Sequence, residues 1–237
     1  MLGFSAVLRR LVHEGALQGD GCAKASALRE LIDALDQLHL KDARRLCEEM
    51  RAGALIEDVA ASVGDSDPSV HQPALMLVTM LTTLEVDSEA DATLVILRDS
   101  GLFVHVLPHL HAADALTIAL ACGACQNACY SDLELVHVLE TRGDIDRIHE
   151  LARCDEPSVA QAASACLHNI EATIALATRA FDAIVRLQRA SRRRIDRARA
   201  NRQRRSLCCH SPDIARAARC LSGGLSSPRE PPSLVWT

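Results

Sequence analysis

The chain has 237 residues, a length that suits one domain with terminal extensions. Apolar residues make up 49% of it but aromatic residues only 2%, so its core must be built from Ala, Leu, Val, Ile and Cys. It has neither long alternating runs of β-branched residues nor about 18 consecutive uncharged apolar residues, which excludes a β-rich fold and a membrane-spanning helix. We find no secretory signal, so we expect an intracellular protein, cytoplasmic, nuclear or both, with reduced cysteines.

The net charge of −5 is distributed unevenly along the chain. Residues 186–205 contain ten arginines and one acid, Asp196, which gives this window a charge of +9 and leaves −14 for the remainder. Such an asymmetry indicates either a charged partner for the basic segment or an intramolecular contact.

The first 40 residues are predicted to contain two amphipathic helices. Residues 1–20 form the first, and residues 22–38 form the second, with apolar side chains at the i, i+3, i+4, i+7 spacing of a packed helix. We interpret residues 1–40 as a helical cap or a degenerate repeat, which a solenoid requires at its end.

A repeat with a glycine at a fixed place follows. Gly101 and Gly143 lie 42 residues apart, and each precedes an asparagine, Asn127 or Asn169, by 26 residues. Gly53 begins an earlier copy that has a threonine in place of the asparagine. A period of about 40 residues in a helical chain is typical of a stacked solenoid.

Each repeat is predicted to consist of three helices, and the glycine ends the first of them in the left-handed conformation. Asp67-Pro68 and Glu156-Pro157 place an acid and a proline at the start of a third helix, where both are favourable. The predicted helices are 41–52, 54–64 and 69–85, then 89–100, 102–112 and 113–129, then 132–142, 144–154 and 157 onward.

Over residues 41–175 this pattern resembles the armadillo-repeat family. The matching segments are Gly53-Ala54-Leu55-Ile56, Gly101-Leu102-Phe103, Gly143-Asp144-Ile145 and the helix ends Cys125 to Ala128 and Leu167 to Ile170. The resemblance implies an all-α, armadillo/HEAT-like, right-handed superhelical solenoid, followed here by a long basic C-terminal helix. It also implies a non-catalytic scaffold for protein–protein interactions, with a groove that binds an extended peptide.

In this resemblance Asn127 and Asn169 correspond to the asparagines that hold a peptide backbone, since an amide both donates and accepts hydrogen bonds. Alternatively, each asparagine caps or cross-links its own helix end. Members of the family that bind basic peptides have a tryptophan four residues earlier, where this chain has Gly123 and Ala165. A groove of the nuclear-import type is therefore not expected.

Residues 176–205 are predicted to extend the last helix and to contain an IQ-like motif. Its apolar–Gln pair is Leu187-Gln188, and Arg192-Arg193 and Arg197 follow at the spacing of the motif. Ile184 and Ile195 lie on the same apolar face, so we expect this helix to bind calmodulin or another EF-hand protein.

Other interpretations of the basic segment stay open. The match can arise by chance in an Arg-rich helix, and the same arginines could bind nucleic acid or an anionic membrane surface. Cys208-Cys209 could also be a palmitoylated pair. Residues 206–237, rich in Gly, Ser and Pro, are predicted to be a disordered tail.

Two clusters have the spacing of metal ligands. Cys122, Cys125 and Cys129 lie on one predicted helix and could serve metal or redox chemistry, but the many small residues around them favour structural packing. We interpret His105, His109 and His111 in the same way. The chain has no phosphate-binding loop or hydrolase motif, so we expect neither an enzyme nor a cofactor, and no small-molecule substrate.

Overall fold

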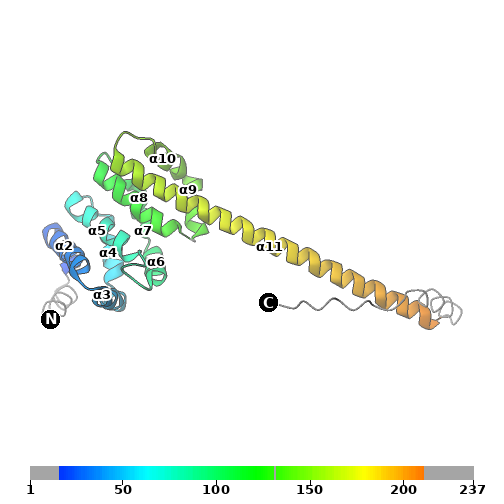
Figure 1. Cartoon of the computed structure of the whole chain (residues 1–237). Helices are drawn as coiled ribbons and strands as arrows, with labels where there is room; N and C mark the ends of the chain where they lie inside the picture. The colour runs from blue at the N-terminus through cyan, green and yellow to red at the C-terminus, as the bar shows by residue number, and fades with distance from the viewer. Residues whose placement is uncertain (1–15, 131, 211–237) are drawn as a thin grey trace, which may run out of the picture. The chain divides into compact units, whose positions relative to one another are not determined.

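The computed structural model describes the backbone of residues 16–130 and 132–210, and the side chains of residues 17–130 and 132–205. Within these ranges all regular structure is helical (Figure 1). The elements are η1 (Ala16–Gln18), α2 (Gly21–Gln37), α3 (Leu40–Ala52), α4 (Leu55–Val63), α5 (Pro68–Leu81), α6 (Ala90–Asp99), α7 (Leu102–His109), α8 (Ala115–Cys129), α9 (Leu133–Arg142), α10 (Asp144–Leu151) and α11 (Pro157–His210). Most of the predicted N-terminal helix and of the predicted tail lies outside the described residues.

Three consecutive helices form each repeat, as the glycine register predicts. The first repeat consists of α3, α4 and α5, the second of α6, α7 and α8, and the third of α9, α10 and the beginning of α11. The third helices pack in a row, because α5 contacts α8 and α8 is hydrogen-bonded to α11. Since α2 packs on α5 in the same way, it takes the third-helix position of an incomplete repeat. The predicted all-α, armadillo/HEAT-like solenoid is thereby confirmed.

Aspartates begin several of these helices by capping their first turn. Asp67 accepts a hydrogen bond from the Ser69 N–H at 2.8 Å, and this bond holds the pKa of its carboxyl below the usual value. Asp114 accepts from the N–H groups of Leu116 and Thr117 at the start of α8. The second repeat therefore keeps the capping acid of the Asp67-Pro68 turn without its proline.

The left-handed residue of the first repeat is not the predicted glycine. Gly101 and Gly143 have φ values of 76° and 79°, as expected, but Gly53 has φ −97° and the left-handed residue is Ala54, with φ 59°. Helix α3 continues to Ala52, and α4 begins at Leu55, one residue later than predicted. Ala54 is thus the structural counterpart of the two later glycines, despite the steric cost of a Cβ there.

The longer spacing of the first repeat has a simple structural origin. Eight residues, Thr82–Glu89, connect α5 to α6, whereas three residues, Tyr130–Asp132, connect α8 to α9. A buried ion pair between Arg51 and Asp87 fills the longer connection, and Thr93 accepts from Arg51 at 2.9 Å and donates to Asp87 at 2.7 Å. Both charges are hydrogen-bonded, which offsets the cost of removing them from water.

Leu, Val, Ile, Ala and Cys build the core, as the composition requires. Small residues allow the third helices to approach closely: a Cβ placed on Gly123 of α8 would lie 3.4 Å from the Thr79 hydroxyl of α5. The cysteines at 47, 122, 125, 129 and 166 are buried members of this core.

By its contacts the chain divides into two units, residues 1–178 and 179–237. The solenoid belongs to the first, and the basic part of α11 to the second. Helix α11 continues to His210, five residues past the last arginine of the basic run. None of the helices in the described part of the chain has an apolar stretch long enough to cross a membrane.

Candidate interaction surfaces

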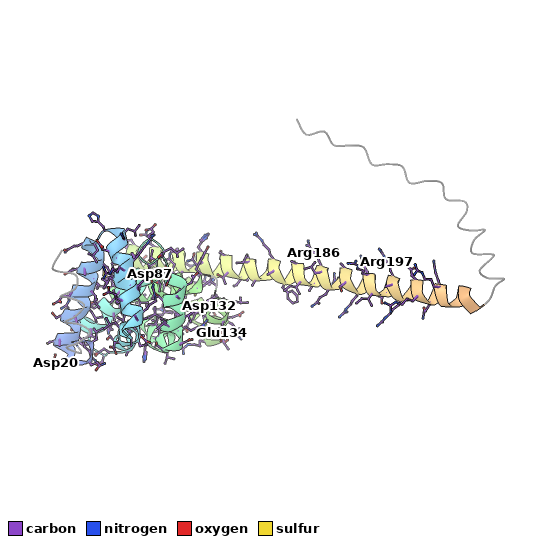
Figure 2. The ribbon with its side chains drawn as sticks, turned by 90° about the horizontal axis from the view of Figure 1, so that it is seen from below. Asp20, Asp87, Asp132, Glu134, Arg186 and Arg197 are labelled. Atoms are coloured by element: carbon purple, nitrogen blue, oxygen red, sulfur yellow. The ribbon has the colours of Figure 1, made fainter. Side chains whose placement is uncertain are left out.

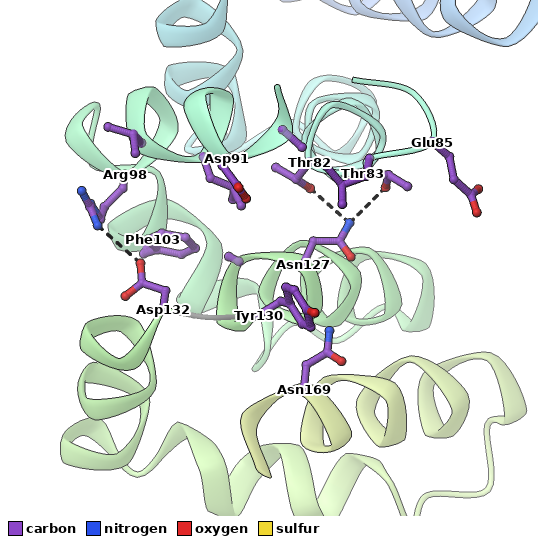
Figure 3. A pocket seen from close by; sticks show the side chains of 15 residues that line it. Thr82, Thr83, Glu85, Asp91, Arg98, Phe103, Asn127, Tyr130, Asp132 and Asn169 are labelled. Atoms are coloured by element: carbon purple, nitrogen blue, oxygen red, sulfur yellow. Dashed lines mark hydrogen bonds and ion pairs between the residues drawn. The ribbon is translucent and has the colours of Figure 1, made fainter. Parts of the chain in front are cut away.

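The solenoid has a hollow of about 590 Å³ where the second repeat meets its neighbours (Figure 3). The connection after α5 forms one wall, α6 and Phe103 form another, and the end of α8 forms the floor together with Asn169 of α11. Both asparagines singled out in the sequence, Asn127 and Asn169, line this hollow. We call it the second-repeat groove.

The amide of Asn127 joins two repeats. Its Nδ2 donates to the carbonyl oxygen of Thr79 at 3.0 Å and lies within 3.2 Å of the hydroxyl oxygens of Thr82 and Thr83. Asn169 repeats the arrangement one repeat later, with Nδ2 2.8 Å from the carbonyl oxygen of Gln126. Each asparagine therefore cross-links its helix to the preceding third helix, rather than capping its own. Their role in binding a peptide stays a prediction.

The wall of the groove combines apolar and acidic side chains. Leu84 and Tyr130 are each 62% exposed and Val95 is 46% exposed, so the groove presents apolar area to solvent. Glu85 lies on the connection after α5 and Asp91 on α6, and neither forms an ion pair with any described residue (Figure 3). The groove therefore combines exposed apolar area with negative charge.

A single cation stands among the described lining residues. Arg98 lies 3.5 Å from Asp132, and it also pairs with the adjacent Asp99. Its charge is thus compensated within the protein. The solenoid around the groove is negatively charged as well, since residues 16–178 contain ten basic and 26 acidic side chains, a net charge of −16. Such a field attracts cationic partners.

Sequence reasoning missed the aromatic residues of the groove. At the position of the tryptophan that basic-peptide binders of the family have, Gly123 lies against Thr79. Tyr130 and Phe103 instead bring aromatic rings to the groove from the helix ends. The signal was available, since Tyr130 is the one tyrosine of the chain and lies at a repeat boundary.

The second surface is the basic segment of α11, residues 179–205, which contains eleven arginines and two aspartates (Figure 2). Almost all of its side chains are exposed. Ile184, Leu187 and Ile195 have exposed fractions of 52%, 71% and 49%, and the sequence reading overlooked Phe181, at 66%. Phe181 lies three residues before Ile184 and extends the same stripe.

The structure places the polar residues of the IQ-like pattern on this exposed helix as well. Gln188, Arg192, Arg193 and Arg197 are all exposed, and none of these arginines is paired with a described acid. The segment therefore combines an apolar stripe with unneutralised positive charge. Whether it binds an EF-hand protein stays a prediction. The side chains of Cys208-Cys209 lie outside the described residues.

The cysteines with ligand-like spacing are buried in the core. Burial raises the pKa of the Cys122 thiol to about 12, and the pKa of the Cys129 thiol is raised by its hydrogen bond with Cys166 and by burial. A thiol that stays protonated is a poor nucleophile and a poor metal ligand. Among the described residues, no three His, Cys, Asp or Glu side chains are grouped to hold a metal ion.

His105 and His109 lie at the junction of the first two repeats, whereas His111 contacts the third. The rings of His71 and His109 are 4.4 Å apart, and His109 Nε2 lies 2.8 Å from the Val63 carbonyl oxygen. The ring of His105 covers Gly64, where a Cβ would come within 2.5 Å of it. His111 lies 3.3 Å from the buried carboxylate of Asp144.

Comparison with known proteins supports the fold. No protein-family model and no curated protein matches this sequence. An engineered protein solved by the Northeast Structural Genomics Consortium is similar in structure, with a TM-score of 0.53 and 20% identity, over 72% of this chain and 64% of that protein. At this identity the similarity concerns the fold alone, and the chain spans less than two thirds of that protein.

Two designed proteins are also similar in structure to this chain. A designed armadillo repeat protein solved with the peptide (KR)4 has a TM-score of 0.46 and 16% identity, over 70% of this chain and 73% of that one. A protein from a set of computationally designed armadillo repeat proteins for modular peptide recognition has the same TM-score and identity, over 73% and 82% of the two chains.

Proposed function

We propose that this protein is a non-catalytic scaffold of the armadillo-repeat type, and that its second-repeat groove binds an extended peptide of a protein partner. The observation that carries the proposal is the exposed apolar area of Leu84, Val95 and Tyr130 in a groove that also contains Asn127 and Asn169. Exposed apolar area in a hollow is typical of an interaction site.

Asn127 and Asn169 suit the recognition of a peptide backbone because an amide can donate to a carbonyl and accept from an N–H group. Both donate to the preceding third helix, so a bound peptide would share or exchange these bonds. The apolar side chains of the groove would then receive the side chains of the peptide. The acids Glu85 and Asp91 favour peptides without negative charge.

Selection from a peptide library tests this proposal. The full chain is used to select binders from a phage-displayed random peptide library, with a Leu84→Asp, Val95→Asp variant as the counter-selection target. Hydrogen exchange of the chain with a selected synthetic peptide should show protection at the ends of α5 and α8 and along α6. Binders that protect other helices, or binders that the variant retains, would contradict the groove as the site.

The basic segment of α11 is proposed as a second binding surface, for calmodulin or another EF-hand protein. The exposed stripe of Ile184, Leu187 and Ile195 supports this assignment, because an amphipathic helix binds with its apolar face in a hydrophobic groove. Gln188, Arg192, Arg193 and Arg197 would contact the acidic rim of such a partner.

The alternative is an adaptor that binds nucleic acid or an anionic membrane through the same arginines. The observation that favours it is the charge of +9 over residues 179–205. Binding to a polyanion depends on the number of arginines rather than on their positions, and it falls steeply with salt. In either case we propose an intracellular location, where these partners occur.

A further inference from the structure

We propose that the basic segment of one copy, residues 179–205, docks on the second-repeat groove of a second copy, so that copies of the chain associate head to tail. This contact needs neither the peptide nor the EF-hand protein of the proposed function. It would occur in the pure protein, and a partner of either surface would compete with it.

The groove offers the negative half of the contact. Glu85 and Asp91 are exposed and have no described cation within 4.0 Å, whereas the third acid of the groove, Asp132, is already paired with Arg98. Tyr130 and Leu84 add exposed apolar area beside them. A ligand that matches this surface must carry both positive charge and apolar side chains.

The basic segment carries both on one helix. Phe181, Ile184 and Leu187 form an exposed apolar stripe, and eleven arginines lie between residues 179 and 205. None of the arginines between residues 179 and 205 forms an ion pair with a described acid. Every copy therefore contains a cationic, apolar helix surface together with an anionic, apolar groove.

The charges of the two surfaces decide in favour of a second copy as the occupant. The solenoid between residues 16 and 178 carries −16 and the basic segment +9. Opposite fields of this size accelerate encounter between copies and orient them. Single exposed ion pairs contribute little, so the contact depends on many charges together with burial of the apolar stripe, and it must weaken with salt.

The two faces of the contact are different surfaces of the chain. A contact between unlike surfaces leaves one free surface of each kind on every complex, so further copies can add. The association should therefore continue beyond a dimer as the protein concentration rises. A copy without a working groove and a copy without a working basic segment should still form one contact with each other.

Sedimentation equilibrium of the full chain at 50 mM and 500 mM NaCl tests the proposal. At 50 mM the average mass should rise with concentration between about 5 and 100 μM, and at 500 mM it should approach the 25.6 kDa of one chain. A chain that stays monomeric at 50 mM, or a mass that does not depend on salt, would overturn the proposal.

Two variants and a control locate the contact. One double variant, Glu85→Lys with Asp91→Lys, changes the groove. The other, Phe181→Asp with Leu187→Asp, changes the basic segment. Each double variant alone should be monomeric, with unchanged helicity. Their equimolar mixture should regain association, with a mass that stops at two chains. The control is the double variant Glu48→Lys with Glu57→Lys, which makes the same change of charge at exposed acids outside the groove. Glu57, like Asp91, lies in the first turn of its helix. This control should associate as the parent does. Equal losses of association in the groove variant and the control, or a mixture that stays monomeric, would overturn the proposal.

Discussion

The amide nitrogen of Asn127 lies 3.0 Å from the carbonyl oxygen of Thr79, 48 residues earlier in the chain. This hydrogen bond joins the ends of α8 and α5 and fixes the floor of the second-repeat groove against its wall. Thr79 also lies against Gly123 of α8, so the same residue determines how closely the two helices approach. The groove and the packing of the repeats therefore depend on the same contacts.

Replacing Asn127 by alanine should lower the free energy of unfolding by about 1–2 kcal/mol, because three acceptors in α5 and the connection after it lose the amide. Asn169→Ala removes a bond to one acceptor and should cost about 1 kcal/mol. Urea denaturation followed by circular dichroism measures both. The exposed Asn201→Ala serves as the control and should stay within about 0.5 kcal/mol of the parent. Equal stability of all three variants would show that these amides are not structural cross-links.

Ala54→Gly should stabilise the solenoid by about 0.5–1 kcal/mol. The left-handed conformation of Ala54 costs about 1–2 kcal/mol that glycine avoids, and the greater freedom of glycine in the unfolded chain offsets part of this gain. Ala172→Gly, an exposed position within α11, should instead destabilise by about 1 kcal/mol. Thermal melts of the two variants should therefore shift in opposite directions, and a destabilised Ala54→Gly chain would refute the assigned conformation.

Stability should decrease in mild acid because of His109. Burial lowers the pKa of this imidazole in the folded chain, and the neighbouring ring of His71 acts in the same direction. The folded state thus binds the proton less readily than the unfolded state, whose pKa is about 6.5. The contribution of His109 is complete above about pH 6.5 and falls below it, by at most about 1.4 kcal/mol per pH unit.

Urea denaturation of the parent and of His109→Gln between pH 7.5 and 5 isolates this contribution, since other groups titrate in both chains. The difference in stability between them should shrink as the pH falls. A constant difference across this range would contradict the prediction.

Leu187→Asp should weaken binding of the full chain to calcium-loaded calmodulin by about 2–4 kcal/mol, because it removes an apolar anchor and places an acid against an acidic partner. Arg199→Ala, outside the IQ-like pattern, should have a much smaller effect. Isothermal titration at several salt concentrations separates the hypotheses. Equal losses at Arg197 and Arg199, little effect at Leu187 and a steep dependence on salt would favour a polyanion as the partner.

The helices and their order could be predicted from the sequence because the ends of the helices carry local signals. Gly101, Gly143 and Asp67 act through their own backbone or through the first turn of their helix, and these effects depend on few neighbours. Ala54 was missed because propensity favours the adjacent Gly53 for a left-handed residue. In the structure α3 runs to Ala52, Gly53 has a negative φ and the left-handed residue is Ala54.

The groove was less predictable because its parts are far apart in the chain. The register of the repeats identified Asn127 and Asn169, but their hydrogen bonds to the preceding third helix depend on how neighbouring repeats stack. The exposed side chains of Leu84 and Tyr130 lie in the connections between helices, where no periodicity marks them. Burial of individual side chains in connections follows from packing rather than from pattern.

The affinity of a library-selected peptide for Tyr130→Ala tests the central claim most directly. Tyr130 is exposed in the groove, whereas Val104 on α7 is 70% exposed and lies outside the groove lining, so Val104→Ala is the matched control. Fluorescence anisotropy of the labelled peptide should give a Kd at least about tenfold higher for Tyr130→Ala, a loss of about 1.4 kcal/mol, and an unchanged Kd for Val104→Ala. Equal affinities for the parent and both variants would contradict a peptide-binding role for this groove.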